Sequence, residues 1–360
     1  MDSPIDVSVV PAGENDQASR RFRRLRAMPG WQKALLLLAV LVLVVVAGVA
    51  GGGYLLYSRY DGKVTRASLL PSVPPEEAAR IEENWKSGAV NLLLLGSDSR
   101  AAEEGQDSAI GARSDTIMLV HIAKGRDRAA IISIPRDSYV DVPAGGSWKG
   151  GKNKINAAFA FGGAALTAQT VERLTGISLD GAMIADFASI RDLVDSVDGV
   201  NVCVPYDVRS SFSGRQWKTG CHDLTGDTAE EFMRQRYHVP GGDFGRMYNQ
   251  QLVVKAVVAK VAKSGTLTDP LALDGLLSIA ADSLTVDENL NLNDLAFAVR
   301  GIRPGAISYA TVPYTTGSLK TSAGTAVQLD TGKAAAMFAA IRDDSIDQWL
   351  AGNPSKTPGS

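Results

Sequence analysis

The sequence predicts an α/β protein: a three-layer α-β-α sandwich with a mixed central sheet, preceded by a single transmembrane helix. Two observations lead to this fold class. Apolar runs of strand length alternate with amphipathic helical runs from residue 89 onward, and residues 34–57 form one long stretch without a charged side chain. Alternating strands and helices are typical of a sheet covered by helices, and we expect a mixed sheet rather than an all-parallel one.

The uncharged stretch at residues 34–57 predicts a membrane anchor. It exceeds the roughly 20 apolar residues that cross the hydrocarbon core of a bilayer. A cleavable signal peptide would have a shorter apolar region that starts closer to the N-terminus. The basic run Arg20–Arg26 precedes the stretch, and such runs stay on the cytoplasmic side. We therefore expect a single-pass protein of the cell membrane, with a cytoplasmic N-terminus and an extracellular C-terminal domain.

The predicted organisation follows composition and periodicity. Six segments are expected: a disordered basic cytoplasmic segment at 1–33, the anchor at 34–57, an extracellular linker at 58–88, an α/β domain at 89–263, a C-terminal extension packed on the same domain at 264–350, and a disordered tail at 351–360.

Apolar patterning then predicts the individual elements of the α/β domain and its extension. Strands are expected at "VNLLLLGSD", "DTIMLVHIA", "RAAIISIPRD", "GVNVCVP" and "ISYATVP". Helices are expected at "INAAFAFGGAALTAQTVERLT" with Gly176 as its C-cap, "FASIRDLVDSV", "TAEEFMRQR" opened by Thr228, "RMYNQQLVVKAVVAKVAKSG", "LALDGLLSIAADSL", "LNDLAFAVRGI" and "KAAAMFAAIRDD". A short amphipathic helix is also expected after Pro74 and Pro75, inside the linker.

Composition excludes several classes of protein. The chain of 360 residues is 45% hydrophobic with a formal net charge of −2, so nothing points to nucleic acid as a partner. The two cysteines, Cys203 and Cys221, flank a polar loop. In an oxidising exterior such a pair favours a disulfide, worth about 3 kcal/mol for a loop of this length. Metal binding by the cysteines is the weaker interpretation, because none of the three histidines has zinc-type spacing to them.

The segment "GSWKGGKN", Gly146–Asn153, nearly matches the phosphate-binding pattern GxxxxGK[ST]. Asn153 stands where a hydroxyl residue would hold Mg²⁺, and no strand leads directly into the segment. We expect instead a flexible basic loop over an anionic ligand, to which three lysines contribute: Lys149, Lys152 and Lys154.

Charged residues cluster at the ends of the predicted elements. They are Asp98, Arg113, Asp115, Arg136, Arg234, Arg236, Asp243 and Arg246, with Gln250 on the helix that follows. Strand ends of α/β domains converge on one crevice. Two carboxylates are a minimal protein contribution to Mg²⁺, and arginine matches phosphate oxygens with two parallel hydrogen bonds. The set therefore indicates a pyrophosphate with its metal ion, although ordinary surface ion pairing stays open for any single pair.

Six segments in the same order resemble the LytR-CpsA-Psr (LCP) family. They are "LLLLGSDSR", "RSDTIMLVHI", "ISIPRDSYVDVP", "KINAAFAFGG", "LVDSVDGVNV" and "RQRYHVPGGDFGRMYNQQ", and they cover roughly residues 90–263 behind a basic N-terminus and one anchor. The cysteine-flanked loop resembles that of the actinobacterial members. The resemblance implies a Mg²⁺-dependent phosphotransferase that moves a glycopolymer from a polyprenyl-pyrophosphate carrier to peptidoglycan and forms a phosphodiester, with residues 89–263 as its catalytic domain.

The resemblance also implies residue roles. Asp98 and Asp115 would hold Mg²⁺, with Mn²⁺ as the alternative ion, and Asp243 would be the general base for the acceptor hydroxyl. The pyrophosphate would be bound by Arg100, Arg113, Arg136, Arg234, Arg236, Arg246 and Gln250. Catalysis would thus depend on Asp98, Asp115, Arg136 and Asp243. A tunnel for the lipid tail would be lined by residues such as Phe159, Phe161 and Leu193, which are equally well explained as core.

Two departures from the family pattern concern the same region. Asn249 stands where an arginine is common, which weakens one phosphate contact. Glu230 and Glu231 replace the usual Ala-Leu, which puts local packing or acceptor contacts in doubt.

Three alternatives to a transferase were weighed on the same residues. The first is a non-catalytic polyprenyl-phosphate binding module at the cell wall, and the second is a pyrophosphatase that releases the lipid-linked precursor to water. A membrane-bound transcriptional regulator is not supported, because residues 1–33 are too short for a DNA-binding domain. Arabinogalactan, teichoic acid and other wall glycans stay open as the polymer, and no feature indicates an oligomeric state.

Overall fold

The computed structural model describes residues 64–97, 114–263, 278 and 284–354. Residues 59–360 form one compact unit. Its strands are β1 (Thr65–Ala67), β2 (Val90–Ser97), β3 (Ser114–Ile122), β4 (Ala129–Ser133), β5 (Tyr139–Val142), β6 (Gly151–Lys154), β7 (Gly181–Asp186), β8 (Val200–Val204), β9 (Val208–Arg209), β10 (Gln216–Trp217), β11 (Gly220–Leu224), β12 (Leu284–Asp287), β13 (Ile307–Thr311), β14 (Tyr314–Thr321) and β15 (Gly324–Leu329).

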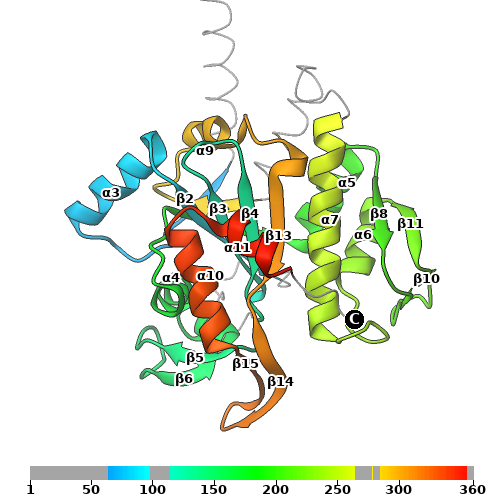
Figure 1. The fold of residues 1–360 in the computed structure, drawn as a ribbon. Helices are drawn as coiled ribbons and strands as arrows, with labels where there is room; N and C mark the ends of the chain where they lie inside the picture. Colours follow the sequence, from blue (N-terminus) through cyan, green and yellow to red (C-terminus); the bar gives the residue numbers. More distant parts are fainter. Residues whose placement is uncertain (1–63, 98–113, 264–277, 279–283, 355–360) are drawn as a thin grey trace, which may run out of the picture. The chain divides into compact units, whose positions relative to one another are not determined.

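Helices connect and cover these strands (Figure 1). They are α3 (Pro75–Lys86), α4 (Ile155–Thr175), α5 (Phe187–Ser196), α6 (Gly226–Met233), α7 (Asp243–Lys263), α9 (Leu292–Val299), the 3-10 helix η2 (Pro304–Ala306), α10 (Thr331–Arg342) and α11 (Ile346–Gly352).

The central sheet has seven strands in the order β1-β12-β7-β2-β3-β4-β13. The pairs β1–β12, β7–β2 and β4–β13 are parallel, whereas β12–β7, β2–β3 and β3–β4 are antiparallel. The sheet is therefore mixed, and the predicted α/β class with a mixed central sheet is confirmed.

The four leucines of β2 explain its place at the centre of the sheet. Leu92, Leu93 and Leu95 are at most 1% exposed, and β3 and β7 pair on either side of the strand. Successive side chains point to opposite faces of a sheet. Leu93 belongs to a core cluster with α4 and α10, whereas Leu94 faces residues of α5, α6 and α7. Helices thus cover both faces of β2.

A second apolar cluster joins α5, α6 and α7 to the strands around the cysteines. Trp217 of β10 packs edge-to-face on Phe232 of α6, with ring centroids 5.3 Å apart. In the antiparallel pair β8–β11, Cys203 lies directly opposite Cys221, and the two form a disulfide. The predicted disulfide is confirmed.

The three predicted central strands and most helices agree with the structure within a few residues. The first long helix covers Ile155–Thr175 as predicted, and Gly176 ends it in the left-handed conformation with φ 64°. This helix is kinked at Gly162 and Gly163, which the apolar pattern did not indicate. The helix expected to open at Thr228 instead begins at Gly226, because Thr225 is its N-cap and Thr228 completes a capping box.

The central sheet includes strands from outside residues 89–263. Strand β1 comes from the expected linker, while β12 and β13 come from the expected C-terminal extension, and all three belong to the seven-stranded sheet. Helix α11 reaches Gly352, so the expected disordered tail begins inside a helix. Strands β1 and β12 are too short to show a period, whereas β13 is the strand predicted at "ISYATVP", whose pairing partner the apolar pattern does not indicate.

Other predictions fall on residues outside the described ranges. These include the cytoplasmic segment at 1–33, the anchor at 34–57 and most of the helix at 271–284. Among the residues that the structure does describe, no helix is both long and apolar enough to span a membrane.

Candidate functional site

One edge of the central sheet gathers the ends of four strands. Strand β7 runs parallel to β2, and β4 also runs in the direction of β2, because β3 is antiparallel to both. Strand β13 is parallel to β4. The carboxyl ends of β2, β4, β7 and β13 therefore lie at one edge, together with the start of β3. In α/β proteins this edge is where ligands bind.

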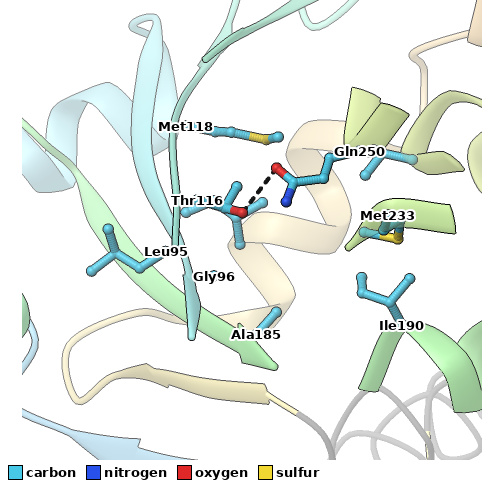
Figure 2. A pocket seen from close by; sticks show the side chains of 10 residues that line it. Leu95, Gly96, Thr116, Met118, Ala185, Ile190, Met233 and Gln250 are labelled. Carbon is cyan, nitrogen blue, oxygen red and sulfur yellow. Dashed lines mark hydrogen bonds between the residues drawn. The ribbon is translucent and has the colours of Figure 1, made fainter. Parts of the chain in front are cut away.

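An apolar pocket lies at this edge, between the sheet and the helices of one face (Figure 2). Its volume is about 400 Å³, part of which is open to solvent. It is lined by Leu94, Leu95, Gly96, Thr116, Met118, Ala185, Ile190, Met233, Gln250 and Val254. The end of β2, the start of β3, the end of α6 and the middle of α7 therefore meet around one cavity.

Among the polar residues that line the pocket, Gln250 has a side-chain nitrogen without a described hydrogen-bond partner. The residue is 1% exposed, and its Oε1 accepts a hydrogen bond of 3.0 Å from the Thr116 hydroxyl. Its buried Nε2 has no partner among the described residues and points toward the enclosed space (Figure 2). A buried amide without a partner costs roughly 1–3 kcal/mol. The amide is therefore available to an acceptor oxygen of a ligand.

A cluster of charges surrounds the start of α7. Arg136, which follows β4, has its Nε 3.4 Å from Oδ2 of Asp243, and Nη2 of Arg246 is 2.9 Å from Oδ1 of the same carboxylate. The Arg246 side chain is 5% exposed and that of Asp243 is 28% exposed. Arg246 and Gln250 are four residues apart on α7, so they share a face of that helix.

A second carboxylate extends this cluster. Asp137 lies 3.9 Å from Nε of Arg136 and 3.4 Å from Nζ of Lys154, and it accepts a hydrogen bond of 3.3 Å from Asn156. The expected loop around "GSWKGGKN" therefore ends in strand β6 rather than in a flexible segment. Of its three lysines, Lys154 is brought beside Arg136.

The two predicted metal ligands are only partly within the described residues. Asp98, like Arg100 and Arg113, lies outside them, and Asp115 is described in its backbone alone. The residues just before the two aspartates, Ser97 and Ser114, are paired across β2 and β3. Among described residues, no three His, Cys, Asp or Glu side chains gather as a metal site would require. Magnesium binding by Asp98 and Asp115 stays a prediction.

Arg234 and Arg236 follow the pocket residue Met233. Arg234 is the C-cap of α6, and its Nη1 is 2.8 Å from Oε1 of Glu230 in the same helix. The guanidinium of Arg236 lies over the exposed ring of Tyr237, 5.0 Å from its centroid. Both arginines are thus next to the pocket in the chain, and their phosphate contacts stay predictions.

Comparison with known proteins agrees with this arrangement. The model of the LytR_cpsA_psr family matches residues 62–343. The chain belongs to the LytR-CpsA-Psr family. It is 34% identical over 224 residues to the polyisoprenyl-teichoic acid–peptidoglycan teichoic acid transferase TagU of Bacillus cereus, a match that covers 61% of this chain and 69% of that protein.

Two further LytR-CpsA-Psr relatives cover more of the chain. The cell wall biosynthesis protein LcpA of Corynebacterium glutamicum is 28% identical over 326 residues, which are 80% of this chain and 60% of LcpA. A solved structure of TagT bound to LI-WTA has a TM-score of 0.54 at 25% identity, and the match covers 71% of this chain and 90% of that chain.

The departures from the LytR-CpsA-Psr pattern have local partners. Asn249 is fully buried, and its Oδ1 accepts a hydrogen bond of 3.0 Å from the Tyr206 hydroxyl. The pKa of Glu231 is lowered, although partial burial by itself acts to raise it. Hydrogen bonds from the Ser210 and Ser213 hydroxyls and the charge of Arg215 outweigh burial and hold the pKa below the ordinary value. Glu231 therefore links α6 to the loop between β9 and β10, and Asn249 links α7 to the segment between β8 and β9.

The three residues that were expected either to line a lipid tunnel or to belong to the core pack in the two apolar clusters. Phe159 is 5% exposed and belongs to the core between the sheet and α4. Phe161 stacks on Trp148, with ring centroids 4.7 Å apart. Leu193 packs on the second apolar cluster. None of the three lines the pocket, because the apolar pattern of a helix does not reveal which neighbour its buried face meets.

The charged motifs of the sequence do not indicate the apolar and hydroxyl residues of the pocket. Thr116 directly follows Asp115, and Met233 directly precedes Arg234, so both stand beside predicted site residues in the chain. That adjacency was the available signal. Ile190 and Val254 had no such signal, because they resemble ordinary core residues of amphipathic helices.

Proposed function

We propose that this protein is a Mg²⁺-dependent phosphotransferase that moves a glycopolymer from a polyprenyl-pyrophosphate carrier to peptidoglycan. The observation that carries the proposal is the position of an apolar pocket beside a cationic cluster at the carboxyl edge of the sheet. The two share helix α7, on which Arg246 and Gln250 are one turn apart. A lipid pyrophosphate has the same two parts, an apolar chain and a charged head.

The named relatives support this substrate class. TagU is a polyisoprenyl-teichoic acid–peptidoglycan teichoic acid transferase, and LcpA is a cell wall biosynthesis protein. TagT has been solved with bound LI-WTA. The same combination of lipid carrier, polymer and wall acceptor suits the pocket and charges of this chain.

The proposed reaction exchanges one phosphorus–oxygen bond for another. The oxygen of an acceptor hydroxyl attacks the phosphorus atom that carries the glycopolymer. The bond from that phosphorus to the bridging oxygen of the pyrophosphate breaks, and polyprenyl phosphate leaves with the electron pair. The hydroxyl proton goes to a base, for which we propose Asp243. No external energy source is needed, because the pyrophosphate bond is already activated.

The cationic cluster would stabilise this transfer electrostatically. Arg136, Arg246 and Lys154 surround two carboxylates, so the described charges of the cluster retain one excess positive charge. Charge shifts toward the leaving phosphate in the transition state, and preorganised cations lower the barrier to that shift. We propose that Arg234, Arg236, Arg100 and Arg113 add to phosphate binding, with Gln250 donating from its free Nε2.

Asp98 and Asp115 are the proposed ligands of Mg²⁺, or of Mn²⁺ in its place. A bound divalent ion would neutralise part of the pyrophosphate charge, and Mg²⁺ keeps its remaining positions for water and phosphate oxygens. Residues 34–57 are proposed to anchor the protein in the cell membrane, with residues 58–360 outside. A lipid-linked donor would then be within reach of the site.

Reconstitution tests the proposal directly. The protein, Mg²⁺, a short lipid-linked oligosaccharide and soluble peptidoglycan fragments would be combined, and mass spectrometry would score the new phosphodiester. We expect transfer by the wild type, loss of transfer on chelation of the metal, and loss in Asp98→Ala with lipid binding retained. Asp127→Ala is the matched control, because Asp127 also follows a strand but lies in the turn at the opposite edge of the sheet.

The outcomes separate the competing functions. Polymer released with a terminal phosphate and without acceptor would identify a pyrophosphatase. Transfer that survives the joint loss of Asp98 and Arg136 would exclude the proposed site. Lipid binding with neither transfer nor hydrolysis would identify a binding module.

A further inference from the structure

Tyr314 presents an aromatic face to solvent beside the charged cluster. The residue is 41% exposed, although one face of its ring is covered by Phe244. The two rings are stacked, with centroids 3.9 Å apart and planes inclined by 7°. Since Phe244 covers one face, the exposed area lies on the opposite face and the ring edge. Phe244 directly follows Asp243 in the chain.

The topology brings Tyr314 to the carboxyl edge of the sheet. It is the first residue of β14 and follows β13, which ends at that edge because it is parallel to β4. The backbone nitrogen of Val312 donates a hydrogen bond of 3.0 Å to the carbonyl oxygen of Ser133. The chain leaving β13 therefore runs beside the chain that leaves β4 and leads to Arg136.

The hairpin β14–β15 is fixed to both segments that carry the ion pair of Arg136 and Asp243. On one side, the backbone nitrogen of Val327 donates a hydrogen bond of 2.8 Å to the carbonyl oxygen of Asp137. On the other side, Gly317 packs so closely on Phe244 that an added Cβ would be 2.9 Å from a ring carbon. The hairpin thus contacts the residues that directly follow Arg136 and Asp243 in the chain.

The surface of the hairpin is polar and nearly uncharged. Lys320 is the one charged residue in the sequence between Tyr314 and Leu329. Thr315 and Ser318 are exposed, and the Ser318 hydroxyl is 3.1 Å from that of Thr316. Hydroxyl groups and an open aromatic face suit a neutral sugar, whose weakly positive C–H groups meet the negative face of the ring. The surface differs from the cationic cluster, which suits phosphate.

We propose that Tyr314 is an acceptor-binding residue, on which a neutral sugar ring of the acceptor glycan stacks. The inference rests on the transfer reaction proposed above. It divides the site into two sides: the pocket and arginines bind the lipid pyrophosphate, and the β14–β15 hairpin binds the glycan that receives the polymer. The C-terminal part of the chain therefore serves acceptor binding as well as the sheet.

Steady-state kinetics with each substrate varied in turn tests this division. In Tyr314→Ala we expect the acceptor KM to rise about 10-fold, the size expected for loss of an aromatic stacking contact. The donor KM should stay within about 2-fold of wild type, since the pocket and arginines are unchanged. Tyr314→Phe and Tyr314→Trp should restore acceptor KM, because each keeps an open ring face. Phe297→Ala is the control, because Phe297 is 56% exposed on α9.

A second measurement is the affinity of the protein for the peptidoglycan fragment, determined by calorimetry in the absence of the donor. It should weaken in Tyr314→Ala and not in Phe297→Ala. An unchanged acceptor KM and unchanged fragment binding would overturn the inference while leaving the transferase intact. The inference would also be overturned if Tyr314→Ala raised the donor KM and the acceptor KM equally and lowered the melting temperature. That result would show that the stack of Tyr314 on Phe244 has a structural role. A wild type that never transfers polymer to the fragments would instead defeat the proposed function.

Discussion

The two edges of the central sheet carry similar charged residues in opposite environments. At the amino ends of β2 and β7, the side chain of Asp180 is fully buried. It accepts hydrogen bonds from Nη1 of Arg80 at 3.1 Å, from Nδ2 of Asn84 at 2.8 Å and from the backbone nitrogen of Asn91 at 2.8 Å. At the carboxyl edge, Asp243 is 28% exposed between Arg136 and Arg246.

The difference shows how the same residue types become structural or functional. Burial raises the pKa of Asp180, although hydrogen bonds from Asn84, Asn91 and Arg80 oppose this shift. Its three donors fix α3, a helix without buried residues, to the starts of β2 and β7. Among the described residues, the carboxyl edge instead has three cations and two carboxylates, together with the amide of Gln250, whose Nε2 has no described partner. That amide can donate to a ligand, whereas the donors around Asp180 are already used by its carboxylate.

The largest effect should come from removing a cation at the carboxyl edge. Arg136→Met should lower the transfer rate roughly 10²–10³-fold, because one preorganised charge at the phosphate is lost. Its free energy of unfolding should change by about 1 kcal/mol or less, since ion pairs that reach solvent contribute little. Arg80→Met is the matched variant and should leave the rate near that of wild type. Mass spectrometry of the product measures the transfer rate of both variants, and urea denaturation measures their free energy of unfolding. Equal losses of transfer rate in Arg136→Met and Arg80→Met would contradict the difference between the two edges.

The next largest effect should be on stability at the amino edge. Asp180→Ala should lower the free energy of unfolding by about 2–3 kcal/mol, because it leaves the buried backbone N–H of Asn91 and two side-chain donors without an acceptor. Asp180→Asn should lose less, since it keeps one acceptor oxygen. Urea denaturation measures both variants. A loss below about 0.5 kcal/mol in Asp180→Ala would show that the network is not structural.

The paired glutamines of α7 give a smaller and more specific contrast. Gln250→Met should lower the free energy of unfolding by only about 1 kcal/mol, because it removes one hydrogen bond from the Thr116 hydroxyl together with an Nε2 that has no described partner, while donor binding weakens. Gln251 is also buried, but its Nε2 donates to Ser133 Oγ at 2.7 Å and to the carbonyl oxygen of Ala310 at 3.0 Å. Gln251→Met should therefore cost about 2 kcal/mol and keep donor affinity. Thermal melts and donor titration check this pair, and the opposite order would refute it.

The smallest effect should be a pH dependence at the amino edge. Burial lowers the pKa of His121, although its hydrogen bond to Asp344 and that charge oppose the shift. A histidine with a lowered pKa binds fewer protons folded than unfolded, so its contribution to stability is present above pH 6.5 and is lost as pH falls toward the folded pKa. His121→Gln should flatten this slope. Urea denaturation at pH 7.5 and 5.5 measures it; identical slopes would contradict the assignment.

Much of the fold could be predicted from the sequence because the signals were local. The run Leu92–Leu95 requires burial on both faces, and Gly176 stops α4 where a left-handed residue is needed. Strands β1 and β12 were not predicted, because each is short. Strand β13 was predicted, but its pairing with β4 was not, because β4 is far away in the chain. The cysteine pair was identified because two cysteines allow one disulfide.

The sequence by itself determined the residue types at the strand ends, the α/β class and the family. Only the tertiary structure decided which of the charged residues share an ion pair, that Gln250 faces a pocket with Thr116, and that Tyr314 stacks on Phe244. The physical reason is that local propensity and apolar periodicity depend on neighbours along the chain. The contacts of a site depend on strand order and register, which distant segments fix together when they pack.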